Sequence, residues 1–313
     1  MTVFNKLEKI LGKNKVKQNV NLSPYLTLRT KTIARFYFEA NTREDLVAAK
    51  KASLETSLPM FMIGGGSNMV IAKPQLVGLI VRNRYMVKKI VEDNGTYIIL
   101  SVSSGYPASR LVKETTDQGL SGFEFQLGLP GTVGGAIYMN SKWTHPLTYF
   151  GDNLIKACLI DSKAQVKTVD RNYFHFAYDY SILQKTKEIL LEAEFKMKRT
   201  DPNLLKKQAK EALDYRKKTQ PMGVFSSGCF FRNISVDEMK KISSPTTSAG
   251  YLIDKAGLKG KSVGNFVVSD VHANFIINKG EGNPKDLVEL VKIIKDRVKE
   301  KFGITLNEEV LII

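Results

Sequence analysis

The sequence has only two cysteines, Cys158 and Cys229, among 313 residues. Two cysteines are too few for a disulfide scaffold and favour a protein of a reducing compartment. No stretch approaches the roughly 18 uncharged apolar residues that a membrane-spanning helix needs. The charged N-terminal segment predicts a short amphipathic helix and not a signal peptide. The chain is therefore expected to be cytoplasmic, without a membrane partner.

Histidine is scarce too, and His145, His175 and His272 have no metal-ligand spacing with one another or with cysteine. We therefore expect no metal site. Acidic residues number 31 against 47 Lys and Arg, which gives a net charge of +16. This charge favours anionic partners in general, among them nucleic acid, a membrane surface and a phosphorylated small molecule. Because the sequence lacks the aromatic–basic interleaving of an RNA-binding platform, nucleic acid is not the expected partner.

The composition is that of a globular protein, with 43% hydrophobic and 25% charged residues. The length suggests about two domains, with one or three also open. Strand and helix patterns mix without a steady βαβ rhythm, which indicates an α+β fold. Helices are expected at residues 43–56, 107–118, 201–218, 247–256 and 283–302. Strands are expected at residues 59–63, 76–81, 87–92, 96–103, 157–161, 165–169, 188–197, 267–277 and 310–313.

Two of these helices have clear sequence signals. Thr42, with Asp45 three residues later, predicts a capping box at the start of helix 43–56. The inner residues of that helix are expected to be Leu46, Ala49 and Leu54. Helix 283–302 has an apolar stripe made of Leu287, Leu290, Val291, Ile294, Val298 and Phe302.

Three consecutive glycines, Gly64, Gly65 and Gly66, come directly after a buried strand and are followed by Ser67 and Asn68. Consecutive glycines let backbone N–H groups surround an anion, and the two polar side chains add donors. A tight structural turn is the alternative. The run matches neither the dinucleotide-binding G-x-G-x-x-G pattern nor the Walker A loop, so neither of those mechanisms transfers.

A second glycine-rich segment covers residues 119–140, with six glycines, one proline and Glu124 as its only charged residue. A simple surface loop would be more polar. The segment therefore indicates backbone that lies close against something flat and large, with a structural loop as the alternative.

The third feature is Cys229, which lies in Ser226-Ser-Gly-Cys-Phe-Phe-Arg-Asn233. A buried structural cysteine is the ordinary alternative, and it fits Cys158 better than Cys229. A thiol with its usual pKa of about 8.5 is mostly protonated at neutral pH and can donate a proton. Glu308 and Glu309 precede the last strand. Taken alone, they indicate only charged side chains exposed to solvent.

Five segments, taken in order, resemble the UDP-N-acetylmuramate dehydrogenase family, also called the UDP-N-acetylenolpyruvoylglucosamine reductases. They are Gly-Gly-Gly-Ser-Asn (64–68), Gly-Leu-Pro-Gly-Thr-Val-Gly-Gly-Ala (128–136), Ser-Gly-Cys-Phe-Phe-Arg-Asn (227–233), His-Ala-Asn-Phe-Ile-Ile-Asn (272–278) and Glu-Glu-Val (308–310). The resemblance covers residues 29–313 and is to the shorter branch of the family.

The resemblance implies a vanillyl-alcohol-oxidase-like (PCMH-type) FAD-binding fold of two subdomains with a C-terminal substrate-binding α+β domain. The implied boundaries are 1–84 for the first subdomain, completed by 304–313, then 85–200 for the second and 201–303 for the substrate domain. The implied cofactors are FAD and, as reductant, NADPH. The implied substrate is a UDP-sugar with an enolpyruvyl ether, and the protein is expected to be a monomer.

The resemblance also implies roles for single residues. Cys229 matches the family's proton donor, and Glu309 matches the glutamate that polarises the enol intermediate. The implied FAD-binding residues are Gly64, Gly65, Gly66, Ser67, Asn68, Gly128, Pro130, Gly131, Thr132, Gly134, Gly135 and Ala136. The implied substrate-binding residues are Tyr178, Arg216, Arg232 and Asn233.

Three segments depart from the family pattern, and one of these departures reverses a charge. Where the family has Tyr-Arg-x-Ser, with an arginine that stabilises developing negative charge, this chain has Tyr178-Asp-Tyr-Ser181. Where the family has Asn-Ala-Gly-x-Tyr-Gly, it has Asn140-Ser-Lys-Trp-Thr-His145, and where the family has an early Thr-x-x-x-Gly-Gly, it has Thr32-Ile-Ala-Arg35 with no glycine pair after it. The resemblance places both of these regions near FAD, so it implies the FAD contacts less firmly than the fold. Either another cation replaces the arginine, with Lys142 and Arg232 as candidates, or catalysis is impaired. Another FAD oxidoreductase of this fold and a non-catalytic binding protein are the rival functions.

Overall fold

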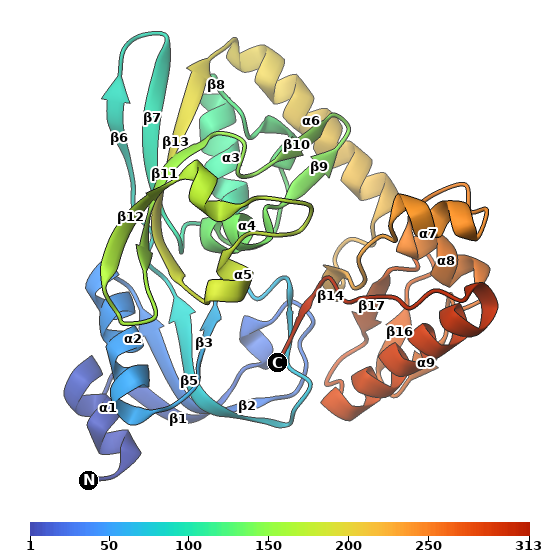
Figure 1. Ribbon diagram of the computed structural model, residues 1–313, viewed down its shortest axis with the longest axis horizontal. Coiled ribbons are helices and arrows are strands. Elements are labelled where there is room, and N and C mark those ends of the chain that lie inside the picture. The colour runs from blue at the N-terminus through green and yellow to red at the C-terminus, as the bar shows by residue number, and fades with distance from the viewer. The chain divides into compact units, whose positions relative to one another are not determined.

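The computed structural model describes residues 1–313 and divides into two compact units (Figure 1). The first unit contains Met1–Asn19, Arg35–Gly65 and Val77–Arg216. The second contains Val20–Ala34, Gly66–Leu76 and Lys217–Ile313. The first glycine-rich run is therefore shared between them, because the boundary falls after Gly65. The expected division into two subdomains and a substrate domain stays a prediction.

A six-stranded antiparallel sheet forms much of the first unit. Its strands follow the order β12-β11-β13-β7-β6, and the short β8 also pairs with β13. The bounds are β6 Lys88–Asp93, β7 Tyr97–Ser103, β8 Leu120–Ser121, β11 Leu154–Ile160, β12 Val166–Asp170 and β13 Ile189–Arg199. Both hairpins that the sequence predicts, at Asn94-Gly95 and between residues 161 and 165, are confirmed.

Helices of the first unit cover this sheet and contribute apolar side chains to its core. α3 (Ala108–Asp117) buries Leu111 and Val112 there, beside a cluster of Phe123, Phe150 and Phe195 with ring centroids 4.6–5.9 Å apart. The other elements are α4 (Val133–Met139), β9 (Lys142–Thr144), β10 (Leu147–Tyr149), α5 (Leu183–Thr186), α6 (Pro202–Thr219) and the 3₁₀ turns Glu124–Gln126 and Arg171–Phe174.

A second sheet has the order β1-β2-β5-β3, with β3 parallel to β5. Its strands are β1 Val16–Asn21, β2 Ile33–Ala40, β3 Met60–Ile63 and β5 Gln75–Asn83; α1 (Val3–Leu11) and α2 (Arg43–Thr56) pack together in the same unit. The capping box of Thr42 and Asp45 is confirmed. The expectation for Leu54 is wrong, because this side chain is 47% exposed.

The second unit has the antiparallel sheet β14-β17-β16-β15, against which α9 packs. Its elements are the 3₁₀ turn Ser23–Tyr25, β4 Met69–Val70, β14 Phe225–Cys229, α7 Val236–Lys241, α8 Ala249–Lys255, β15 Ser262–Val263, β16 Phe266–Val268, β17 Phe275–Asn278, α9 Pro284–Phe302 and β18 Leu311–Ile312. The predicted stripe of α9 is buried except for Phe302, which packs partly buried at the edge of the core.

One predicted strand is wrong. Residues 267–277 do not form a single strand, because the chain turns back between β16 and β17, which pair antiparallel. The Ser269 hydroxyl accepts hydrogen bonds from the backbone N–H groups of Val271 and His272, which fixes the start of the turn. Such local side-chain-to-backbone bonds compete with strand pairing.

No helix of the chain has both the length and the apolar content to span a bilayer.

Glu114 on α3 provides a test of the packing in the first unit. Burial raises the pKa of its carboxyl, but hydrogen bonds from Lys88, Tyr106 and Arg110 lower the pKa by more, to about 2. Since the ordinary value is about 4.3, the stabilisation is complete above that pH and is lost as the pH falls towards 2. Glu114→Gln should reduce the free energy of unfolding by on the order of 1–2 kcal/mol at pH 7 and by almost nothing near pH 2. Urea unfolding across this pH range measures the difference, and a pH-independent difference would contradict the account.

Candidate functional site

The two glycine-rich segments meet in the first unit, at the end of β3. A Cβ atom built at Gly64 would lie 2.5 Å from Oγ1 of Thr132, and one built at Gly65 would lie 2.5 Å from Cα of Gly131. Real Cβ atoms do not approach other atoms so closely, so only glycine fits at both positions. Gly65 therefore lies against the backbone of Gly131, and Gly64 against the Thr132 side chain, although Gly65 and Gly131 are 66 positions apart.

The second segment is held in place by backbone hydrogen bonds. Gly131 O accepts from Ala108 N at 3.0 Å, Val133 N donates to Tyr106 O at 2.9 Å, and Gly134 N donates to Ser104 O at 2.8 Å. These bonds fix the residues around the start of α4 to the end of β7 and to α3. Pro130 and Gly135 are exposed, and Ala136 is buried beneath them. Gly128 and Gly131 have φ values of +83° and +103°, which favour glycine.

This arrangement fits the diphosphate and adjoining parts of a dinucleotide. Backbone without side chains lets a ligand approach closely, and its N–H groups are suitable donors to an anion. The fit rests on the close approach of the two glycine-rich segments at Gly64 and Gly65, where a Cβ atom would collide with Thr132 or Gly131 and push the segments apart.

The rest of the first glycine run belongs to the second unit, where it lies beside the C-terminal strand. A Cβ atom at Gly66 would lie 2.1 Å from Tyr25 O. Asn68 O accepts from Leu311 N at 3.0 Å, and the Asn68 side chain donates to Glu309 O at 3.4 Å. Ser67, between them, is half-buried. The predicted sheet position of the C-terminus is confirmed by the parallel pairing of β18 with β4.

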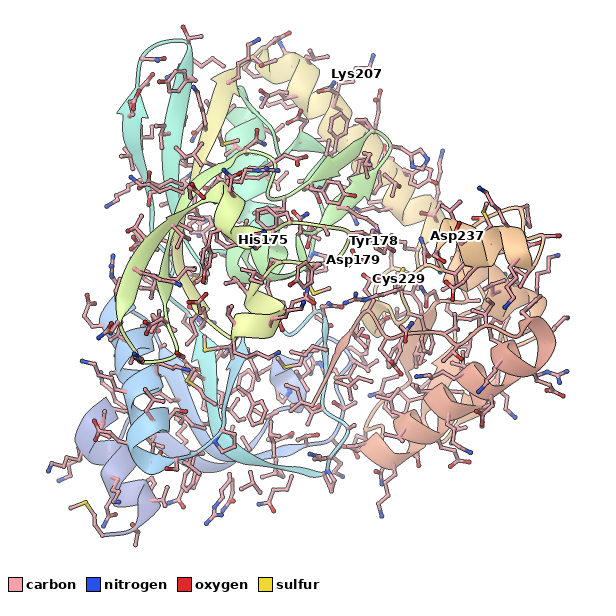
Figure 2. The ribbon with its side chains drawn as sticks, viewed as in Figure 1. His175, Tyr178, Asp179, Lys207, Cys229 and Asp237 are labelled. Atoms are coloured by element: carbon pink, nitrogen blue, oxygen red, sulfur yellow. The ribbon has the colours of Figure 1, made fainter.

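The segments that contain Cys229 and Glu309 lie next to each other within the second unit, although the two residues are 80 positions apart. Cys229 ends β14, and the next residue, Phe230, accepts a backbone hydrogen bond from Glu309 N at 2.9 Å. Phe231 and Glu308 form the following bridge. Cys229 and Glu309 are both half-buried, whereas Phe230 is fully buried and anchors the segment. Figure 2 labels Cys229 at this end of β14.

Asn274 holds this segment in its path. Its side chain accepts from Phe231 N at 2.9 Å and donates to Phe231 O at 2.8 Å. In the sequence Asn274 is only one member of the segment His-Ala-Asn-Phe-Ile-Ile-Asn (272–278), and nothing there predicts this structural role. The one sequence signal that could have identified Asn274 is its place, directly after His272 and Ala273, in a segment that resembles the family.

Asn233 and Arg232 follow Phe231 in the second unit. Asn233 Oδ1 accepts from Ala249 N at 3.2 Å, at the start of α8, and the residue is exposed. Arg232 is half-buried, and its Nε has no hydrogen-bond partner.

The other two expected substrate residues, Arg216 and Tyr178, belong to the first unit. The guanidinium of Arg216 lies 4.5 Å from the ring centroid of Trp143, a residue that the sequence analysis does not single out. Tyr178 is 36% exposed, and the Lys142 ammonium lies 3.3 Å from its ring centroid. Figure 2 labels Tyr178 and Asp179 on the loop that precedes α5.

Fold and site together define a class, the FAD-binding oxidoreductases of the vanillyl-alcohol-oxidase-like fold. Residues 34–170 match the family described as "FAD binding domain". A Phl p 4 variant described as a glucose oxidase is similar in fold alone, with a TM-score of 0.52 at 12% identity, covering 98% of this chain and 60% of that one.

Closer similarities identify the family. Residues 220–313 match the C-terminal domain family of UDP-N-acetylenolpyruvoylglucosamine reductase. Reductases of that name from Protochlamydia amoebophila and Chlamydia trachomatis serovar D are 33% and 35% identical, over 95% of this chain and 93% and 96% of theirs. The crystal structure of the reductase from Thermus caldophilus has a TM-score of 0.75 at 29% identity, over 95% of this chain and 98% of that chain. The chain belongs to the UDP-N-acetylenolpyruvoylglucosamine reductase family, which confirms the predicted family and fold class.

Gly65→Ala tests the two glycine-rich segments, residues 64–68 and 128–136, which together form the glycine cradle. The added methyl would overlap the Gly131 backbone, so the two segments must separate, and we expect the purified protein to lose most of its bound FAD. The ratio of flavin to protein absorbance measures this loss. Gly95→Ala is the control: its φ is positive, unlike that of Gly65, but no atom lies within 4 Å of its Cβ position. It should lose some stability and keep its flavin; equal flavin content in the two variants would contradict the assignment.

Proposed function

We propose that the protein is an NADPH-dependent flavoenzyme that reduces the enolpyruvyl ether of UDP-N-acetylglucosamine to UDP-N-acetylmuramate, a precursor of peptidoglycan. The observation that supports this most directly is the backbone hydrogen bond between Phe230 and Glu309, because it holds the segments that carry Cys229 and Glu309 next to each other in the second unit. Both groups suit the reduction of a vinyl ether, which needs a hydride at one carbon and a proton at the other.

FAD would be held by Gly64 to Asn68 and by Gly128 to Ala136, where side chains are small or absent. When bound, it accepts a hydride from NADPH and supplies one to C3 of the enolpyruvyl group. The two-segment cradle and the family membership support this assignment. The cytoplasm, where NADPH and UDP-sugars occur, is the proposed location, and residues 1–84, 85–200 and 201–303 are the proposed domains.

Cys229 would supply the proton. As hydride reaches C3, negative charge develops on C2 and its carboxylate, and the thiol donates its proton to C2. The thiolate that remains recovers a proton from solvent. Gly228, with φ of +82°, precedes the thiol, and a left-handed residue there lets the strand bend so that the sulfur can reach a ligand.

Glu309 would polarise the enol-like carboxylate, while Tyr178, Arg216, Arg232 and Asn233 would bind the nucleotide and sugar. Arginine suits this work because its guanidinium stays charged and forms paired bonds to phosphate and carboxylate. A positive charge close to the developing negative charge lowers the barrier.

There are two alternative functions: another FAD oxidoreductase of this fold, and a family member with impaired catalysis. Anaerobic addition of the enolpyruvyl UDP-sugar to NADPH-reduced protein distinguishes the proposed function from both alternatives. Rapid flavin reoxidation supports the proposal. A reduced flavin that this sugar does not reoxidise would contradict it.

Cys229→Ala should leave flavin reduction by NADPH within a few-fold of the wild type. Reoxidation by the sugar should slow by roughly 100- to 10,000-fold, the usual loss for a missing acid. Stopped-flow absorbance measures both steps. Cys158→Ala is the matched control, because Cys158 lies in β11, where its sulfur accepts a hydrogen bond from Arg43. Equal slowing of both steps in Cys229→Ala would be inconsistent with a proton donor.

Glu309→Gln should slow reoxidation by about 10- to 100-fold, since the amide keeps the shape of the side chain and loses its charge. Glu308→Gln provides the comparison. Glu308 forms an ion pair with Lys295 at 2.8 Å and is the next residue in the chain. Its loss should lower stability slightly without changing the rate. If both substitutions slow reoxidation alike, Glu309 has no special role.

A further inference from the structure

Lys142 and Asp179 form a largely buried ion pair in the first unit. The Lys142 Nζ lies 3.4 Å from Asp179 Oδ2, and the exposed fractions of the two side chains are 18% and 5%. The same ammonium lies 3.3 Å from the ring centroid of Tyr178. One lysine therefore contacts both a carboxylate and the face of an aromatic ring.

The loop that contains Asp179 is firmly anchored to the end of α4. Asn140 donates to Ala177 O at 3.1 Å, and Ser181 donates to Tyr138 O at 2.8 Å. Gln184 donates to the backbone oxygens of Asp179 and Tyr138, at 2.8 and 3.1 Å. α4 is seven residues long, or about 10 Å, and it begins next to Thr132 of the glycine cradle. The pair is thus held at a fixed place one short helix from the cradle.

Stability alone does not explain this pair. Removing two charges from water is costly, and an apolar pair of similar volume would often serve as well or better. Asp179 also has a φ of +48°, a strained value for a residue other than glycine. Buried charges and backbone strain of this kind gather at functional sites.

The hydrogen-bonding capacity of the two side chains indicates whether Lys142 or Asp179 binds the ligand. An ammonium has three N–H donors; the Asp179 carboxylate takes one, and the Tyr178 ring faces another. One donor remains for an anionic oxygen. Asp179, being more deeply buried, fits the role of holding the lysine in place.

We propose that Lys142 binds an anionic oxygen of the sugar-nucleotide substrate, with Asp179 as its positioning residue and the Tyr178 ring packed against its ammonium. Two of the segments that depart from the family pattern are then explained together: the positive charge moves from the loop to Lys142 on β9, and Asp179 on the loop contributes the counter-ion. The inference rests on the proposed function.

The test uses full-length, flavin-loaded protein in four variants: Lys142→Met, Lys142→Arg, Asp179→Asn and the double variant Lys142→Met/Asp179→Asn. Three properties are measured: the rate of flavin reoxidation by the enolpyruvyl UDP-sugar, the Kd of UDP-N-acetylglucosamine, and the melting temperature. The control is Lys185→Met. Lys185 is exposed, on α5, with its Nζ 5.9 Å from the Tyr180 ring centroid, and its loss should change none of the three.

Lys142→Met should keep flavin reduction by NADPH but lose about 100-fold in substrate binding or in reoxidation. Lys142→Arg should recover part of this loss, and Asp179→Asn should have a smaller effect. The double variant should regain the melting temperature that Lys142→Met loses, because no unpaired buried charge remains, but not the rate. A weaker Kd for UDP-N-acetylglucosamine identifies the diphosphate as the bound anion. An unchanged Kd with slow reoxidation identifies the enolpyruvyl carboxylate.

Two results would overturn the inference. Wild-type rate and Kd in Lys142→Met would show that the lysine does not touch substrate, and full recovery of rate in the double variant would show that the pair is only structural. Failure of the proposed function looks different, since the wild-type protein itself would then not be reoxidised by the sugar.

Discussion

The close approach of two backbones, Gly64-Gly65 and Gly131-Thr132, is the constraint on which the rest of the first unit depends. No side chain fits between them, so the end of β3 and the start of α4 must remain together. α4 then sets the position of the loop before α5 through the side chains of Asn140, Ser181 and Gln184. The glycine cradle, α4 and the Lys142–Asp179 ion pair are thus connected in one unit. This connection would keep the proposed cofactor site and the proposed substrate-binding lysine at a fixed separation.

The second unit holds the segments of Cys229 and Glu309, the two residues proposed to take part in the reaction, next to each other. The Cys229 strand and the Glu309 segment are joined by backbone hydrogen bonds, so the two segments stay side by side. Asn274 reinforces this by bonding both backbone groups of Phe231. Acid–base chemistry depends on such fixed geometry more than on the identity of any one loop residue.

Local signals in the sequence predict much of this architecture. The Thr42 cap, the Asn94-Gly95 turn and the α9 stripe each depend on a few neighbouring residues, and the structure confirms them. α4 was not predicted, because its glycines lower helix propensity and tertiary packing decides its conformation. The Lys142–Asp179 pair joins residues 37 positions apart, and no local pattern encodes such a contact. The sequence gives each residue's chemistry, but only folding determines which residues meet.

The visible absorption spectrum of the purified protein, recorded before and after anaerobic addition of NADPH, tests the central claim most directly. If the two glycine segments hold FAD as described, the protein is yellow and NADPH bleaches it. A colourless protein that cannot be reconstituted with FAD would contradict the account, because the cradle would then have no ligand to explain its shape.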